Sequence, residues 1–139
     1  MAKDGNSRKL VLLVDDDEIH LTITESELKN DYEVVMVKSG EEALDFLSKS
    51  HIVPDLVLLD ILMPEMNGWE VFDKINDMAT LKLTQIMFFT SLAEESAKEK
   101  AYEMGAFDYI TKPCEESVLR DKIKNTIQKA ELRKQQYGA

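Results

Sequence analysis

The feature that most constrains the fold is a run of four apolar residues, Leu56–Leu59, that stops at a carboxylate, Asp60. A short continuous apolar run is typical of a strand buried on both faces, like the central strands of parallel sheets. Pro64 cannot continue a strand, and Asn67 with Gly68 favours a loop before a new helix. An acid at the carboxyl end of such a strand lies where open α/β sheets bind ligands.

Three further apolar runs also end in polar side chains that can take part in chemistry. The runs are Leu10–Val14, Gln85–Phe89 and Ala106–Ile110. The groups that follow them are the acids Asp15, Asp16 and Asp17, the hydroxyls Thr90 and Ser91, and the segment Thr111, Lys112 and Pro113. A single aspartate at a strand end is commonly a surface residue. Because parallel strands end at one edge of a sheet, we expect these polar groups to converge there.

Amphipathic helical patterns separate the apolar runs, and a fifth strand is expected at Tyr32–Val37. The residues with helical spacing that we expect to face the core are Ile19, Leu21, Ile23 and Leu28; Ala43, Leu44 and Leu47; Val71, Phe72 and Ile75; Ala97, Ala101 and Met104; and Val118, Leu119, Ile123 and Ile127. Each connection is long enough for a right-handed helical crossover, which requires parallel strands. The sequence therefore predicts an α/β fold, a doubly wound five-stranded parallel sheet with five helices on both faces.

Local signals mark where the helices begin and end. Asp17 or a neighbouring acid is suited to cap the first helix, although capping needs one acid and the chain has three there. Gly105 is expected to end the fourth helix. The apolar face of that helix is mostly alanine, so we expect it to be held against the core weakly and to be displaced more easily than the other helices. Residues 79–84 are expected to form a polar connection. Three pairs have capping-box spacing at a helix start: Ser39 with Glu42, Asn67 with Glu70, and Ser91 with Glu94.

Length and charge fit a single acidic domain. A chain of 139 residues can bury a core of its own without a disulfide or a structural metal. The 27 acidic residues against 17 basic residues give a net charge of −10, which argues against direct binding to nucleic acid. We predict a flexible arm over residues 1–8, a folded domain over residues 9–130, and a helical extension or the start of a linker over residues 131–139.

Cysteine usage and hydropathy indicate the cellular compartment. Cys114 is the only cysteine, which excludes an internal disulfide and fits a reducing environment. No apolar run approaches the roughly 20 residues that a membrane span needs, and the start of the chain lacks a signal-peptide core. We therefore expect a cytoplasmic protein without membrane contact. His20 and His51 have no second ligand at regular spacing, so we interpret both as surface residues rather than metal ligands.

The clustered acids predict a metal site with a nucleophile beside it. Carboxylates within a few ångströms raise one another's pKa, and a small hard cation such as Mg²⁺ relieves that repulsion. Asp15, Asp16 and Asp60 would supply carboxylate oxygens, and a backbone carbonyl near Leu62 is suited to add another. Asp60 stands alone at its strand end, so it is the better candidate for a nucleophile that attacks phosphorus.

An ammonium and a hydroxyl would stabilise the charge on a transferred phosphoryl group, and Lys112 and Thr90 are the candidates. With these groups, the chain resembles the receiver domains of two-component response regulators. The resemblance covers about residues 9–130. The matching motifs come in the family's order and spacing: Asp15-Asp16, Asp60 before Met63-Pro64 and Gly68, Thr90, and Lys112-Pro113.

The resemblance implies strand order 2-1-3-4-5 and a phosphoacceptor function. A histidine kinase or a histidine phosphotransfer protein would donate a phosphoryl group from phosphohistidine in a Mg²⁺-dependent reaction. The domain would catalyse only its own phosphorylation and slow dephosphorylation, so it would not otherwise be an enzyme. Phosphorylation would alter the face formed by the fourth helix, fifth strand and fifth helix. This face would then contact a downstream effector domain or form a homodimer. The residues implied are the phosphoacceptor Asp60; the metal ligands Asp15, Asp16, Asp60 and the Leu62 carbonyl; the phosphate-binding Thr90 and Lys112; the switch residues Thr90 and Tyr109; and a cis Pro113.

The chain departs from the family pattern at three positions. Cys114 stands where phenylalanine is common, so packing beneath the fifth helix should be rearranged. Leu62 and Leu92 are apolar where receivers that lose phosphate quickly carry polar residues, so we expect slow autodephosphorylation. Apolar side chains obstruct an attacking water molecule rather than orient it.

Three other functions share part of this pattern. A phosphorylation-independent interaction module of the same fold usually lacks one of the acidic, hydroxyl or lysine groups, which are all present here. A haloacid-dehalogenase-like phosphatase also uses Asp, Thr, Lys and Mg²⁺, but Ile19 stands where that family has Thr or Val, and a second late acidic pair is missing. A flavin-binding relative would need a glycine- or serine-rich loop after the first strand.

Overall fold

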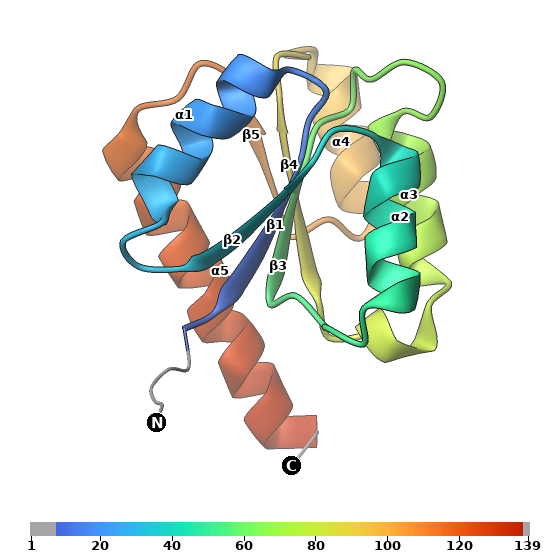
Figure 1. Cartoon of the computed structure of the whole chain (residues 1–139), viewed down its shortest axis with the longest axis vertical. Helices are drawn as coiled ribbons and strands as arrows, with labels where there is room; N and C mark the ends of the chain where they lie inside the picture. Colours follow the sequence, from blue (N-terminus) through green and yellow to red (C-terminus); the bar gives the residue numbers. More distant parts are fainter. Residues whose placement is uncertain (1–7, 138–139) are drawn as a thin grey trace.

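The computed structural model describes residues 8–137, which form a parallel sheet covered by helices on both faces (Figure 1). The five strands pair in the order β2-β1-β3-β4-β5, and all four pairings are parallel. The predicted fold class and strand order are therefore confirmed. Residues 1–7 of the predicted arm, and Gly138 and Ala139, lie outside the described residues. The strands are β1 (Leu10–Val14), β2 (Glu33–Val37), β3 (Leu56–Leu59), β4 (Gln85–Thr90) and β5 (Asp108–Thr111).

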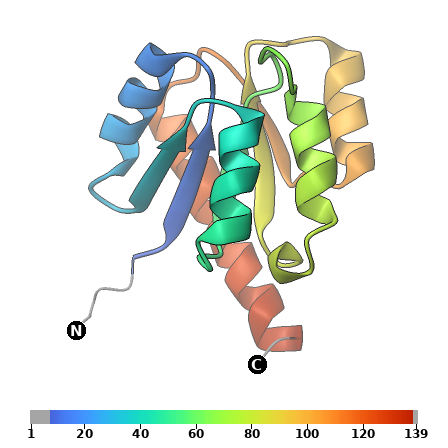
Figure 2. The same ribbon diagram turned by 45° about the vertical axis from the view of Figure 1, so that its right-hand side comes forward.

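The helices divide between the two faces of the sheet. α1 and α5 cover one face, and α2, α3 and α4 cover the other (Figures 1 and 2). A short 3-10 helix, η1, lies in the connection predicted to be only polar, and it buries Leu81. The bounds are α1 (Glu18–Leu28), α2 (Gly40–Lys49), α3 (Gly68–Asn76), η1 (Ala79–Leu81), α4 (Glu95–Met104) and α5 (Glu116–Tyr137).

Alternation along the strands feeds two separate cores. In β4, Ile86 and Phe88 pack toward α2, α3 and α4, whereas Met87 and Phe89 pack toward α1 and α5. All four residues of β3 are buried, as the apolar run predicted. Strand register brings the carboxyl ends of the strands to one edge of the sheet, with Val14 opposite Leu59 and Leu59 opposite Phe88. Packing in the two cores therefore holds in place the strand ends that the polar groups follow.

The expected inward face of α1 was wrong in part. Leu21, Thr24 and Leu28 are buried, whereas Ile19 is 72% exposed and Ile23 is 50% exposed. Asp17 caps the helix by accepting from the Ile19 and His20 amides. The buried stripe contains a threonine, so apolar spacing alone favoured the neighbouring isoleucines.

The predicted cap of α4 was also wrong. Ser39 and Asn67 cap α2 and α3 as expected, and Asn67 forms a complete capping box with Glu70. By contrast α4 begins at Glu95, and its N-cap residue Glu94 makes no side-chain cap bond. In the segment before it, the Leu92 amide donates to the Thr90 hydroxyl oxygen at 3.3 Å. Capping-box spacing therefore predicts a helix start only where the preceding loop has no other partners.

The long helix α5 packs against the core and pairs with residues at the amino edge of the sheet. Leu119, Ile123 and Ile127 face the core, whereas Val118, which was expected to do so, is 40% exposed. Further along the helix, Glu131 pairs with Lys9 at 3.0 Å. Lys134 pairs with Asp55 at 3.3 Å. The part of the predicted extension that the structure describes thus contacts the domain. Within residues 8–137, no helix combines the length and apolarity needed to cross a bilayer.

Candidate functional site

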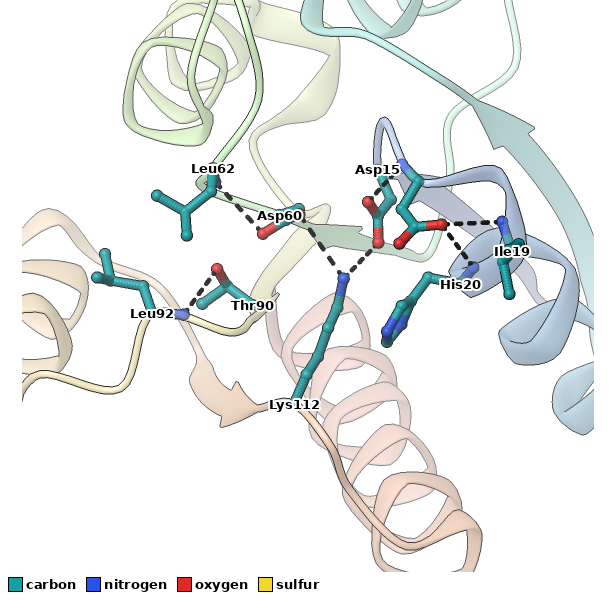
Figure 3. A network of polar contacts seen from close by, with 9 residues as sticks. Asp15, Ile19, His20, Asp60, Leu62, Thr90, Leu92 and Lys112 are labelled. Atoms are coloured by element: carbon teal, nitrogen blue, oxygen red, sulfur yellow. Dashed lines mark hydrogen bonds and ion pairs between the residues drawn. The ribbon is translucent and has the colours of Figure 1, made fainter.

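Four of the polar residues predicted to converge, Asp15, Asp60, Thr90 and Lys112, lie together at the carboxyl edge of the sheet (Figure 3). Asp15 and Asp16 follow β1, Asp60 follows β3, and Lys112 follows β5. Oxygens of the three carboxylates lie within 4.8 Å of one another. Asp15 and Asp60 are buried, and Asp16 is exposed. The edge therefore holds three acids of which two have little contact with water.

Lys112 inserts its ammonium between the two buried acids. Its side chain is 7% exposed, and Nζ pairs with Asp15 and lies 3.6 Å from Asp60 Oδ2. The Lys112–Pro113 peptide bond is cis. Thr90, at the end of β4, is completely buried next to this group. The amine that the sequence placed at a strand end thus belongs to the acidic site and is not a solvated surface lysine.

Backbone amides orient both buried carboxylates. The Asp17 amide donates to Asp15 Oδ1 at 2.9 Å, and the Leu62 amide donates to Asp60 Oδ1 at 3.3 Å. The Asp60 loop is held in turn by Gly68, whose amide donates to the Ile61 carbonyl at 3.0 Å. A Cβ on Gly68 would lie 2.3 Å from the Asp60 carbonyl oxygen. Close approach of α3 to the Asp60 backbone therefore requires glycine.

The electrostatics of the site disfavour a free Asp60 carboxylate. Burial raises the pKa of Asp60, and the charge of Asp15 raises it further. Hydrogen bonding to Thr90 and the charge of Lys112 act in the opposite direction without cancelling the effect of burial. Three carboxylates with one ammonium leave an excess of negative charge, and a small divalent cation such as Mg²⁺ prefers such oxygen ligands. The residues present therefore fit a Mg²⁺ ion.

Thr90 and Tyr109 are connected through the loop between β4 and α4. The Leu92 amide donates to Thr90 Oγ1 at 3.3 Å, and the Tyr109 hydroxyl donates to the Leu92 carbonyl. Tyr109 is 6% exposed, and its ring centroid lies 6.1 Å from that of Phe88. Burial raises the pKa of Tyr109, so the hydroxyl keeps its proton as a donor. The ring of Tyr109, which the family resemblance implies is a switch residue, is therefore turned inward in this structure.

A pocket of about 350 Å³ opens over the acids, and one of its lining residues, His20, was not predicted to belong to the site. His20 and Ser91 line it together with the acids, Leu62, Lys112 and Pro113. His20 was expected at the surface, and it is partly buried at this rim. A single histidine on a helix gives no spacing signal, so only the fold shows which loop it faces. His51 is exposed, with a φ of 61°.

Comparison with known proteins was made on both sequence and structure. A family model described as the response regulator receiver domain matches residues 11–124. The alkaline phosphatase synthesis transcriptional regulatory protein PhoP of Bacillus subtilis is 31% identical over 125 residues, covering 89% of this chain and 50% of that protein. The chain spans about half the length or less of such curated relatives, with 29%, 50% and 16% in three cases.

Solved structures agree with the sequence match. A response regulator receiver domain protein (CheY-like) from Methanospirillum hungatei has a TM-score of 0.83 and 29% identity, covering 91% of this chain and 99% of that chain. The BeF3-activated DrrB receiver domain has a TM-score of 0.78 and 26% identity, covering 88% of this chain and 99% of that chain. The similarity therefore extends over nearly the whole described fold.

Proposed function

The chain belongs to the response regulator receiver domain family, and from this we propose that Asp60 accepts a phosphoryl group in a two-component phosphorelay. One observation carries the proposal. Asp60 ends the central strand within 4.8 Å of two further carboxylates, with the Lys112 ammonium 3.6 Å away. A nucleophile, a set of metal ligands and a cation are thus held at one sheet edge.

The proposed reaction is a direct transfer between protein side chains. The donor is a phosphohistidine on a histidine kinase or on a histidine phosphotransfer protein. A carboxylate oxygen of Asp60 forms the new bond to phosphorus while the bond between phosphorus and the histidine nitrogen breaks, and the imidazole leaves with the bonding electron pair. The product is an aspartyl phosphate. Each protein molecule accepts one phosphoryl group and is itself the product, so the chain is a phosphoacceptor rather than an enzyme that turns over a substrate.

The other groups at the edge stabilise the charge that is transferred. The Lys112 ammonium and the Thr90 hydroxyl donate to phosphoryl oxygens. Asp15, Asp16, Asp60 and the Leu62 backbone carbonyl would hold Mg²⁺. When bound, Mg²⁺ supplies charge neutralisation for the phosphoryl oxygens. Leu62 is 52% exposed beside Asp60, and its apolar side chain shields the product from water, in keeping with slow dephosphorylation.

We propose that phosphorylation is read through Thr90 and Tyr109. A hydrogen bond from Thr90 to the phosphoryl group would favour the conformation with Tyr109 inward, and so alter the face formed by α4, β5 and α5. This is a population shift, whose size is set by the difference in phosphoryl contacts between the two states. The output would act on a downstream effector domain or a homodimer through this face, in the cytoplasm and without direct contact to nucleic acid or membrane.

The experiment is incubation with a small phosphodonor such as acetyl phosphate, with and without Mg²⁺, followed by intact-mass measurement. The expected result is a Mg²⁺-dependent gain of one phosphoryl group that Asp60→Asn abolishes. Asp45→Asn is a matched control, because Asp45 lies in α2 away from the site. A phosphorylated histidine phosphotransfer protein serves as a second donor. No transfer from either donor would favour the phosphorylation-independent interaction module instead.

A further inference from the structure

Helix α4 has few apolar contacts to hold it in one position. Ala97 and Ala101 are its buried residues, and Met104 is partly buried against the same core. Alanine has little side-chain surface to bury, and the other positions are mainly Glu, Lys and Ser. The helix also lacks a side-chain cap at its start. Contacts made by individual long side chains therefore contribute strongly to the position of α4.

Lys100 makes one such contact, to the neighbouring helix α3. Its Nζ lies 4.4 Å from the ring centroid of Trp69, which is in the first turn of α3. A cation over an indole face is attracted by the ring quadrupole. Within residues 8–137, Lys100 has no carboxylate partner within ion-pair distance. The indole is thus its specific contact in the described part of the chain.

The contact continues through aromatic rings to the functional site. Trp69 meets Phe88 edge-on, with centroids 5.0 Å apart, and Phe88 lies 6.1 Å from the Tyr109 ring. The Tyr109 hydroxyl bonds the Leu92 carbonyl, and the Leu92 amide bonds Thr90. An unbroken series of contacts therefore runs from Thr90 to Lys100. Its members come from β4, the following loop, β5, α3 and α4.

We propose that the contact between Lys100 and Trp69 is a latch that holds α4 in the position compatible with an inward Tyr109 ring. The latch rests on the proposed function, since it regulates the response of the same site. A contact biases two conformations only if it is stronger in one of them. Lys100 and Trp69 lie on different helices, so displacement of α4 breaks the contact. Loss of the latch therefore favours the other conformation and weakens binding of phosphoryl groups at Asp60.

The test uses beryllofluoride with Mg²⁺ as a mimic of the phosphoryl group, with occupancy followed by fluorine NMR. Lys100→Met removes the charge and keeps an unbranched side chain, whereas Lys100→Arg keeps the charge. Lys98→Met is the matched control, because it makes the same charge change on the same helix, and Lys98 lies over no aromatic ring among residues 8–137. We expect Lys100→Met to need about two- to fivefold more beryllofluoride for half-occupancy, as the loss of an exposed cation–π contact implies. Lys100→Arg and Lys98→Met should match the wild type.

The outcomes separate the latch from the proposed function. Equal half-occupancy in wild type and Lys100→Met would overturn the latch and leave the phosphoacceptor function standing. An equal shift in Lys98→Met would overturn it as well, because the cause would be net charge. Trp69 emission in the free protein must change in Lys100→Met, and unchanged emission would show that the contact is not made. A wild type that neither binds beryllofluoride nor gains a phosphoryl group would overturn both.

Discussion

At the scale of single residues, the ionised form of Asp60 is unfavourable in the folded protein. Burial first, and the Asp15 carboxylate second, raise the pKa of Asp60. In the metal-free protein the folded state therefore binds the Asp60 proton more tightly than the unfolded chain does. Such a group contributes stability while it is protonated, and this contribution is lost as pH rises through the folded pKa. At neutral pH, ionised Asp60 thus lowers the stability of the metal-free fold.

Asp60→Asn should therefore stabilise the metal-free protein at neutral pH. The expected gain is on the order of 1 kcal/mol or less, because the side chain keeps some solvent contact. The gain should shrink toward about pH 4, where the wild-type carboxyl becomes protonated. Urea unfolding of both proteins with a chelator, at the two pH values, measures this difference. A gain of the same size at both pH values would contradict the role of the Asp60 charge.

Lys112 makes the opposite contribution, because its ammonium neutralises Asp15 and Asp60 inside the site. Lys112→Met should lower the free energy of unfolding by about 3 kcal/mol without Mg²⁺, since it leaves buried acids unpaired. Mg²⁺ should restore part of that stability, because the cation then binds carboxylates that no longer have an ammonium partner. Urea unfolding with and without Mg²⁺ measures both effects. Lys38→Met, which breaks an exposed pair with Glu18, should change stability little.

If the free energy of unfolding of Lys112→Met did not change with Mg²⁺ concentration, the acids would not form the metal site. Loss of stability equal to that of Lys38→Met would show that Lys112 is not held between the acids.

At the scale of elements, the start of α3 positions the Asp60 loop. Gly68→Ala should lower the free energy of unfolding by about 3 kcal/mol, because its Cβ would overlap the Asp60 backbone. Gly105→Ala is the contrasting variant, since a Cβ there meets nothing within 4 Å and only its φ of 107° is unfavourable. Its expected cost is about 1 kcal/mol. Urea unfolding compares them, and equal losses would show that backbone conformation rather than close packing governs Gly68.

The elements also show where sequence patterns stop being informative. The apolar runs of β3 and β4 predicted buried strands correctly, since every residue of both strands is buried. On α1, two apolar stripes compete, and the structure buries the one interrupted by Thr24. Ser91 had the spacing of a cap but lies in the loop before α4, where the Leu92 amide bonds the Thr90 hydroxyl. Periodicity identifies an element, whereas tertiary contacts decide its face and its end.

At the scale of the whole molecule, metal binding and folding should be coupled. A ligand that binds only the folded state stabilises it by about 1.4 kcal/mol for each tenfold rise in concentration above its Kd. The free energy of unfolding of the wild type should therefore rise with Mg²⁺ concentration. Asp16→Asn should reduce this dependence with little effect on the metal-free protein, because Asp16 is exposed. Identical Mg²⁺ dependence in both proteins would exclude Asp16 as a ligand.

Much of the site could be predicted because parallel strands end at one edge. Asp15, Asp60 and Lys112 each follow an apolar run, so knowing the sheet is enough to bring them together. The strand order itself came from the family resemblance, since the run pattern is compatible with other orders. The inward ring of Tyr109 and the approach of Lys100 to Trp69 depend on side-chain packing between distant segments. Single-sequence spacing has no signal for such contacts.

In the proposed function Asp60 is the residue that carries the phosphoryl group, and chemical mapping identifies the acceptor residue. Borohydride reduces an aspartyl phosphate to homoserine, releasing phosphate, so the acceptor is marked in the sequence. The protein would be phosphorylated with Mg²⁺, reduced, digested and sequenced by tandem mass spectrometry. We expect homoserine at position 60, with Asp15 and Asp16 unchanged. Homoserine at Asp15 or Asp16, or at no position after a measured gain of phosphoryl mass, would contradict it.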